Sequence, residues 1–239
     1  MITLITCTGG RPEAWALCQK YIARQTRREP TQWIVVYDTD EVPALLNLPP
    51  HIKVEMYKGP KPWRQGINTQ RPNMDEALKY VKGDVIFTIE DDDYYAPNYI
   101  EMMLFFLQKF DVVGQGNSRY YNIKERQYKE WNNYKHCSLN ETAFKKSKLD
   151  ILDRAVNSGN MYFDIALWER VINEKHVHLI FNHIGLVTGM KGLPGKAGIG
   201  GGHHDLKEQG FRSDSLLEKL REWVGPESAK EYAALAQKK

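Results

Sequence analysis

The stretch Asp84–Val–Ile–Phe–Thr–Ile–Glu–Asp–Asp–Asp–Tyr–Tyr–Ala–Pro97 decides how we interpret the rest of the chain. Residues 85–89 are apolar or β-branched, and four consecutive carboxylates, Glu90 to Asp93, follow them. A short apolar run bounded by Gly83 and a polar cluster is typical of a buried parallel strand. Ligands of open α/β sheets bind at the carboxyl ends of such strands. The sequence therefore predicts a functional site at the four carboxylates.

Adjacent carboxylates repel one another strongly unless a cation lies among them. Oxygen ligands suit a hard cation, Mg²⁺ or Mn²⁺, which often arrives with the phosphates of a substrate. An acidic loop or a helix N-cap is the alternative, because Asp is favoured at the start of a helix. The position of the carboxylates, after a strand and before Pro97 and a helix expected over 98–110, favours the metal role.

Composition narrows the class of protein. A chain of 239 residues with 42% hydrophobic content can bury the core of one large or two small domains. The start of the chain does not resemble a signal peptide, and no apolar stretch is long enough to span a bilayer. Three cysteines at unrelated spacings argue against a disulfide framework and a zinc site. We expect a cytoplasmic protein without a membrane span, of unknown oligomeric state.

Basic and aromatic residues alternate between positions 119 and 135. A net charge of +3 is too balanced to indicate nucleic-acid binding by itself. Basic residues interleaved with aromatic ones could nevertheless hold nucleic acid or stack on sugars. A partly exposed, mixed sheet face is the alternative. The residues are Arg119, Tyr120, Tyr121, Lys124, Arg126, Tyr128, Lys129, Trp131, Tyr134 and Lys135.

The N-terminal half alternates strands and helices. Strands are expected over 2–7, 33–37, 52–56, 85–89 and 112–115, with helices over 12–25 and 73–81. This order predicts an α/β fold with a mostly parallel, Rossmann-like sheet flanked by helices. The Gly-containing turn between the first strand and helix could bind an anion or a nucleotide, although it matches neither GxGxxG nor a P-loop. Asp38 ends the second strand, where it could contact a nucleoside or form a turn.

The second half is less regular. Residues 117–150 have weak periodicity and predict a small β-rich insertion built onto the sheet. A helix is expected over 163–171, with Asp164 at its start, where the helix dipole would keep the carboxylate ionised or where it would serve as an N-cap. Residues 179–186 are expected to be a strand or extended segment. The tail 214–239 is expected to be a helix interrupted near Gly225 and Pro226, packed on the sheet or on a second subunit.

Between these elements, residues 189–205 hold seven glycines. We expect no stable element there, but a loop whose backbone can approach a ligand closely. Lys191 and Lys196 could close over a diphosphate. His203 and His204 end the loop and give a weak metal signal.

These features resemble the nucleotide-diphosphosugar glycosyltransferases of the GT-A fold, closest to family 2. In that family the fourth strand ends in a metal-binding Asp-x-Asp, followed by another Asp and, four residues on, by Pro. Here Glu90 replaces the first Asp, Asp91 is the variable residue, Asp92 takes the metal position, and Asp93 and Pro97 follow. The resemblance implies a metal held by Glu90, Asp92 and Asp93, with His203 or His204 completing its ligands.

The family's second marker is a Glu-Asp pair before a Leu-Trp-x-Arg helix, and its Asp is the catalytic base. Asp164 precedes Leu167-Trp168-Glu169-Arg170 at the matching spacing, whereas Phe163 replaces the Glu. The resemblance makes Asp164 the expected base. The expected donor-binding residues are Thr6, Thr8, Arg11, Asp38, Asn73, Asp91, Lys191 and Lys196.

The function implied is the transfer of a sugar from a nucleotide-diphosphate donor, with a lean to UDP-sugars, to an acceptor hydroxyl with inversion. The acceptor would be a soluble glycan or a hydroxymethylated base in DNA, as in phage-type glucosylation. Residues 1–116 would bind the nucleotide sugar, 117–213 would form the acceptor side, and 214–239 a tail. A sugar-phosphate nucleotidyltransferase, or a non-catalytic nucleotide-sugar-binding module, are the alternatives that the sequence leaves open.

Overall fold

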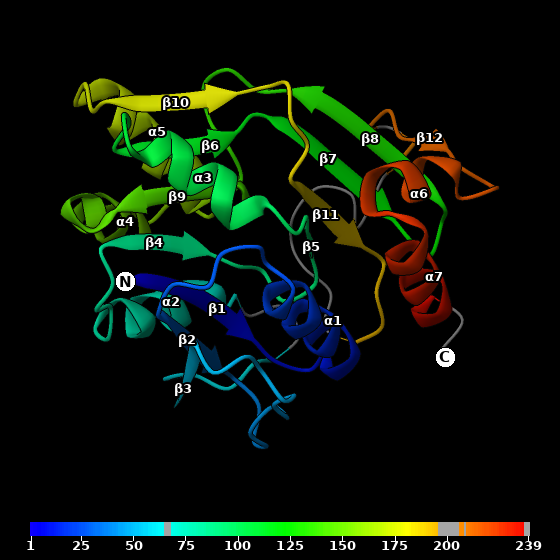
Figure 1. The fold of residues 1–239 in the computed structure, drawn as a ribbon, viewed down its shortest axis with the longest axis horizontal. Coiled ribbons are helices and arrows are strands. Elements are labelled where there is room, and N and C mark those ends of the chain that lie inside the picture. The colour runs from blue at the N-terminus through cyan, green and yellow to red at the C-terminus, as the bar shows by residue number, and fades with distance from the viewer. Residues whose placement is uncertain (65–67, 196–205, 208, 237–239) are drawn as a thin grey trace.

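A computed structural model describes residues 1–64, 68–195, 206–207 and 209–236 (Figure 1). Strands and helices alternate in the first half as expected, with boundaries within a few residues of the predicted ones. The elements of this half are β1 (Ile2–Thr8), α1 (Pro12–Ala23), β2 (Thr31–Tyr37), β3 (Ile52–Lys58), α2 (Gln70–Leu78), β4 (Val85–Thr88), β5 (Tyr94–Tyr95), α3 (Tyr99–Leu107) and β6 (Val112–Gln115).

The second half contains more regular structure than its sequence pattern suggests. Within the described ranges, no helix combines the length and the apolar character needed to cross a membrane. The elements are β7 (Asn117–Asn122), β8 (Gln127–Asn132), the 3₁₀ turns η1 (Leu139–Glu141) and η2 (Lys146–Lys148), β9 (Thr142–Lys145), α4 (Leu149–Val156), α5 (Phe163–Asn173), β10 (His178–Phe181), β11 (Val187–Lys191), β12 (Arg212–Ser213), α6 (Glu218–Val224) and α7 (Pro226–Leu235).

The main sheet has seven strands in the order β10-β6-β9-β4-β1-β2-β3. β1 pairs in parallel with β2 and β4, β2 with β3, and β6 with β10. The prediction of a mostly parallel α/β sheet is therefore confirmed. β9 is the exception: it lies between β4 and β6, antiparallel to both, and points against its neighbours in Figure 1.

The inner strands β1, β2 and β4 bury both of their faces, which is why they consist mostly of apolar or β-branched residues. Alternate residues of one strand enter different core clusters: Leu4 packs in one and Ile5 in the other, and Phe87 and Ile86 divide in the same way. The first cluster includes side chains of α1 and α3, and the second those of α2, α4 and α5. Helices thus cover both faces of the sheet, as predicted.

The expected insertion over 117–150 is β-rich, but only part of it is an addition to the sheet. β7 and β8 form a hairpin in a second, five-stranded sheet of order β12-β8-β7-β11-β5, whereas β9 enters the main sheet. The prediction that 189–205 lacks a stable element is wrong at its start, because β11 runs to Lys191 and pairs with β7. Residues 196–205 lie outside the described residues.

The C-terminal tail packs on this chain. It forms two helices that meet at Gly225, as the sequence predicts, and Leu220, Trp223 and Tyr232 are buried in the first core cluster. α7 lies beside α1, where Lys20 pairs with Glu231 at 2.8 Å (Figure 1). The described tail is therefore part of the core.

We predict that Leu220→Ala lowers the free energy of unfolding by about 2–5 kcal/mol, because Leu220 is fully buried and its truncation leaves a cavity. The same substitution at Leu216, which is 67% exposed, should cost less than about 0.5 kcal/mol. Urea denaturation of both variants measures the difference. Equal costs would contradict the docking of the tail.

Candidate active site

A cavity of about 430 Å³ opens at the carboxyl ends of the central strands. This is where an α/β sheet is expected to bind its ligand. Its wall is formed by the loop before α1, the segment before α2, the acidic turn after β4 (residues 90–93), the β7–β8 hairpin and the start of α5. Of the residues expected to act in the site, Arg11, Asp38, Asn73, Glu90, Asp91, Asp92, Asp164 and Lys191 line it.

The acidic turn is fixed to the sheet through its backbone. The Ile89 N–H donates to the Ile5 carbonyl at 2.8 Å, which extends the pairing of β4 by one residue beyond its end. The Glu90 N–H donates to the hydroxyl of Tyr95 at 2.7 Å. The carboxylates that follow are therefore presented from a rigid strand end.

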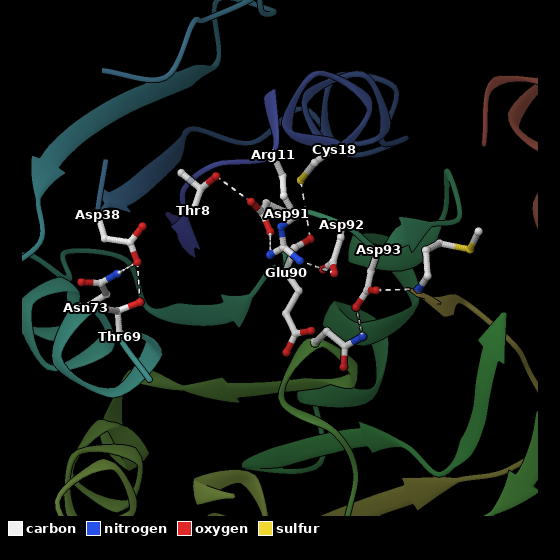
Figure 2. A network of polar contacts seen from close by, with 12 residues as sticks. Thr8, Arg11, Cys18, Asp38, Thr69, Asn73, Glu90, Asp91, Asp92 and Asp93 are labelled. Atoms are coloured by element: carbon white, nitrogen blue, oxygen red, sulfur yellow. Dashed lines mark hydrogen bonds and ion pairs between the residues drawn. The ribbon is translucent and has the colours of Figure 1, made fainter. Parts of the chain in front are cut away.

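Arg11 neutralises part of this turn (Figure 2). Its guanidinium, from the loop before α1, pairs with Asp91 and, at 2.5 Å, with Asp92. The Thr8 hydroxyl donates to Asp91 at 2.6 Å. Burial alone would lower the pKa of Arg11, but the carboxylates of Asp91 and Asp92 outweigh it and raise that pKa. Arg11 therefore stays charged, and its positive charge reduces the repulsion among the carboxylates.

Asp93 holds the second sheet against the turn. Its carboxylate accepts hydrogen bonds from the Met190 N–H at 2.8 Å and from Nδ2 of Asn140 at 2.5 Å. Nζ of Lys191 lies 3.7 Å from the same carboxylate. Burial would lower the pKa of Lys191, but Asp93, Asp92 and Glu90 raise it, so this lysine is a second buried cation.

Three carboxylates of the turn lie close enough together to share a metal ion. Oxygens of Glu90, Asp92 and Asp93 lie within 4.8 Å of one another. Burial raises the pKa of Glu90 to about 7, and its side chain points away from the Arg11 guanidinium in Figure 2. Three hard oxygen donors at this spacing fit Mg²⁺ or Mn²⁺. A divalent cation would also favour the ionised form of Glu90.

A second polar cluster also lines the cavity. Asp38, at the end of β2, accepts from the Thr69 hydroxyl at 2.5 Å and from Nδ2 of Asn73 at 3.2 Å. Thr69 and Asn73 are four residues apart at the start of α2, and therefore share one face. Gly9 is required beside them, because a Cβ there would lie 1.9 Å from Oδ1 of Asp38.

Asp164 lies in the first turn of α5 and faces the same cavity. Burial outweighs the backbone hydrogen bonds at this helix start and raises the pKa of the Asp164 carboxyl above the ordinary aspartate value. The charge of His136, another lining residue, acts in the opposite direction. Tyr162, and not Asp164, is the N-cap residue.

Not every expected residue reaches the cavity. Thr6 is fully buried and accepts from Nε1 of Trp33 at 2.9 Å, so it supports the core. Thr8 and Asp93 do not line the cavity either: the Thr8 hydroxyl donates to Asp91, and Asp93 accepts from Asn140 and from the Met190 N–H. Lys196, His203 and His204 lie outside the described residues. The sequence analysis missed Thr69, whose spacing from Asn73 was a usable signal, and Trp63 and His136, for which no local pattern exists.

Comparison with known proteins identifies the family. Residues 51–176 match the sequence model of glycosyl transferase family 2. The chain belongs to this family. The matched range includes the acidic turn, the hairpin and Asp164, and the order of elements is that of the GT-A fold predicted from the sequence. A comparison with curated proteins found no significant match.

Solved structures support the GT-A fold. The mannosyltransferase PcManGT from Pyrobaculum calidifontis, in complex with GDP-Man and Mn²⁺, aligns with a TM-score of 0.57 and 12% identity over 98% of this chain and 73% of its own. TarS of S. aureus aligns with a TM-score of 0.52 and 10% identity over 79% of this chain. TarS 1–349 in complex with UDP-GlcNAc aligns with a TM-score of 0.51 and 10% identity over 79% of this chain. The aligned region spans 36% of the first TarS chain and 58% of the second.

We predict that Arg11→Met lowers the free energy of unfolding by about 3 kcal/mol, because it leaves buried carboxylates without their cation. Arg27→Met is the matched control, since Arg27 pairs with Glu29 on the surface and its loss should leave the stability nearly unchanged. Denaturation without divalent metal measures both. Equal losses would show that Arg11 is not needed to compensate the turn.

Proposed function

We propose that the chain is a metal-dependent glycosyltransferase that moves a sugar from a nucleotide-diphosphate donor to an acceptor hydroxyl with inversion. One observation carries the proposal: Glu90 and Asp92, from the acidic turn, and Asp164, from a helix far away in the sequence, line the same cavity. A transferase of this kind needs a cation for the leaving group and a base for the acceptor.

The donor would lie between the two polar clusters. Asp38 and Asn73 would bind the nucleoside, because they supply buried hydrogen-bonding groups in the cavity wall. Arg11 and Lys191 are buried cations that would face the diphosphate, with Lys196 as a further expected contact. The lean to UDP over other nucleotides stays a prediction.

Glu90, Asp92 and Asp93 would hold the metal, Mn²⁺ or Mg²⁺, with His203 or His204 as expected additional ligands. When bound, the metal would neutralise the charge that develops on the departing nucleoside diphosphate. Arg11 and Lys191 would supply further positive charge on the same side without moving a proton, because their pKa values are raised.

Asp164 would accept the proton of the acceptor hydroxyl as the new bond forms. A base on the face opposite the leaving group implies direct displacement, hence inversion at the anomeric carbon. Its raised pKa makes it a stronger base than an ordinary aspartate. The acceptor would be a soluble glycan or a hydroxymethylated base in DNA. A cytoplasmic location also stays a prediction, supported by three free cysteines.

The first test measures slow donor hydrolysis, with water as the acceptor, in a panel of nucleotide sugars with Mn²⁺. We expect release of nucleoside diphosphate from one donor, and loss of at least about a hundredfold in rate in Asp92→Asn, because the metal loses a carboxylate. Asp150→Asn, at a carboxylate 65% exposed on α4, should have no effect.

The outcomes separate the classes of function. Metal-dependent binding of a donor without any turnover would favour a non-catalytic binding module. Pyrophosphate release from a nucleoside triphosphate and a sugar phosphate would favour a nucleotidyltransferase. Absence of both binding and hydrolysis for every donor would refute the glycosyltransferase.

A further prediction concerns Asp164. At saturating donor and Mn²⁺, hydrolysis should fall as the pH decreases, at a pH above the ordinary aspartate value of about 4, because the base must be ionised and burial raises its pKa. Asp164→Asn should lower kcat by about 10²–10⁴ and remove this limb of the pH profile. Donor binding, measured by calorimetry, should persist in the variant. An unchanged pH profile would exclude Asp164 as the base.

A further inference from the structure

The β7–β8 hairpin presents different residues on its two faces. In its antiparallel register Tyr120 lies opposite Lys129, and Tyr121 lies opposite Tyr128. Side chains alternate between the faces of a strand, so these two pairs point in opposite directions. Tyr120, Lys129 and Trp131 line the cavity. The other face packs on the tail, where Tyr121 donates to Asp214 at 2.9 Å.

This alternation divides the basic-aromatic stretch. On the face away from the cavity, Nε of Arg119 pairs with Glu130 at 2.9 Å. At the hairpin turn, Arg126 donates to the Ser215 carbonyl at 3.3 Å. Both arginines thus contact the protein itself, and neither lines the cavity. Of the basic residues between 119 and 135, only Lys129 lines it within the described part of the chain.

The cavity face of the hairpin carries a compact platform of Tyr120, Lys129 and Trp131. The ring centroids of Tyr120 and Trp131 lie 4.9 Å apart, and the two rings are tilted by 59° relative to each other. Nζ of Lys129 lies 4.9 Å from the Trp131 centroid. Nζ of Lys191 lies 5.3 Å from the Tyr120 centroid, and the same lysine reaches Asp93. The platform is thus continuous with the acidic turn.

Within the described ranges Lys129 forms no ion pair with a carboxylate, and its ammonium group lies over the Trp131 ring. A cation–π contact at a partly exposed site contributes little, so an anion could replace it with a stronger charge-assisted hydrogen bond. His136 lines the same cavity and adds a second group that can carry positive charge.

We propose that this platform is the acceptor subsite and that it takes an acidic saccharide. The apolar C–H groups of a sugar ring would contact Tyr120 and Trp131, and a carboxylate, phosphate or sulfate on the saccharide would pair with Lys129. Asp164, in the wall of the same cavity, would then meet an acceptor hydroxyl. The inference rests on the proposed function, because it assigns the acceptor of that reaction.

A saccharide fits these observations better than DNA does. Binding to duplex DNA needs several phosphate contacts spread along the backbone. Here Lys129 and the two aromatic rings are gathered inside one cavity, and the neighbouring arginines are occupied by the protein itself. One anionic group next to an aromatic surface is what a single acidic sugar unit offers.

The test compares ligands that differ only in charge. Trigalacturonate and its methyl ester form one pair, and a phosphorylated maltotriose and maltotriose form the other. Calorimetry with the full chain, Mn²⁺ and the nucleoside diphosphate of the hydrolysed donor gives each affinity. We expect the charged member of at least one pair to bind about tenfold more tightly than its neutral partner. This difference in affinity should become smaller at high salt.

Variants assign the effect to the platform. Lys129→Gln should bind both members of the pair equally, and Lys129→Arg should restore the preference for the charged one. Lys135→Gln, an exposed control outside the cavity lining, should keep the preference. Trp131→Ala should weaken both members about tenfold, because the ring contact does not depend on the charge.

The inference is overturned if neither charged saccharide binds better than its neutral partner, or if Lys129→Gln keeps the preference. It is also overturned if a duplex with hydroxymethylated cytosine binds more tightly than both acidic saccharides. Donor hydrolysis by the wild-type chain is measured on the same samples. Hydrolysis without a preference for charge refutes only the acceptor assignment, whereas absence of hydrolysis refutes the proposed function.

Discussion

The structure depends on the compensation of buried negative charge at the end of β4. Four carboxylates follow the central strand, and Asp91, Asp92 and Asp93 are almost fully buried. Such a group is tolerated only when each charge has a partner. Arg11, from the loop before α1, pairs with Asp91 and Asp92, and Lys191, from β11, lies beside Asp93. The charges that a donor diphosphate would meet are therefore also charges that hold the fold together.

The same compensation explains how the two sheets are joined. Asp93 accepts from the backbone of β11 and from Asn140 in η1, while the acidic turn itself continues from the main sheet. The cavity lies where these elements converge. These hydrogen bonds hold β11 and η1 at the acidic turn, and the hairpin with Tyr120 and Trp131 reaches the cavity through its pairing with β11.

Local pattern was sufficient for those parts of the fold in which burial repeats at short range. The strands around Leu4, Val35 and Phe87, and the placement of the acidic turn, followed from apolar runs and their ends. It failed where distant residues decide the outcome. β11 forms within a glycine-rich stretch because β7 lies beside it, and the pKa of Asp164 is set by burial that the sequence does not display. The positions of Trp63 and His136 in the cavity lining likewise depend on residues far away in the sequence.

The position of β9 limits how this protein could be rebuilt. Because β9 lies between β4 and β6, the segment that follows the hairpin is a structural member of the main sheet, and its removal would separate the strand that carries the acidic turn from the outer strands. The hairpin of residues 117–132 belongs to the second sheet alone. Exchange of the hairpin would therefore leave the strand order of the main sheet unchanged, whereas residues 142–145 are needed to join β4 to β6.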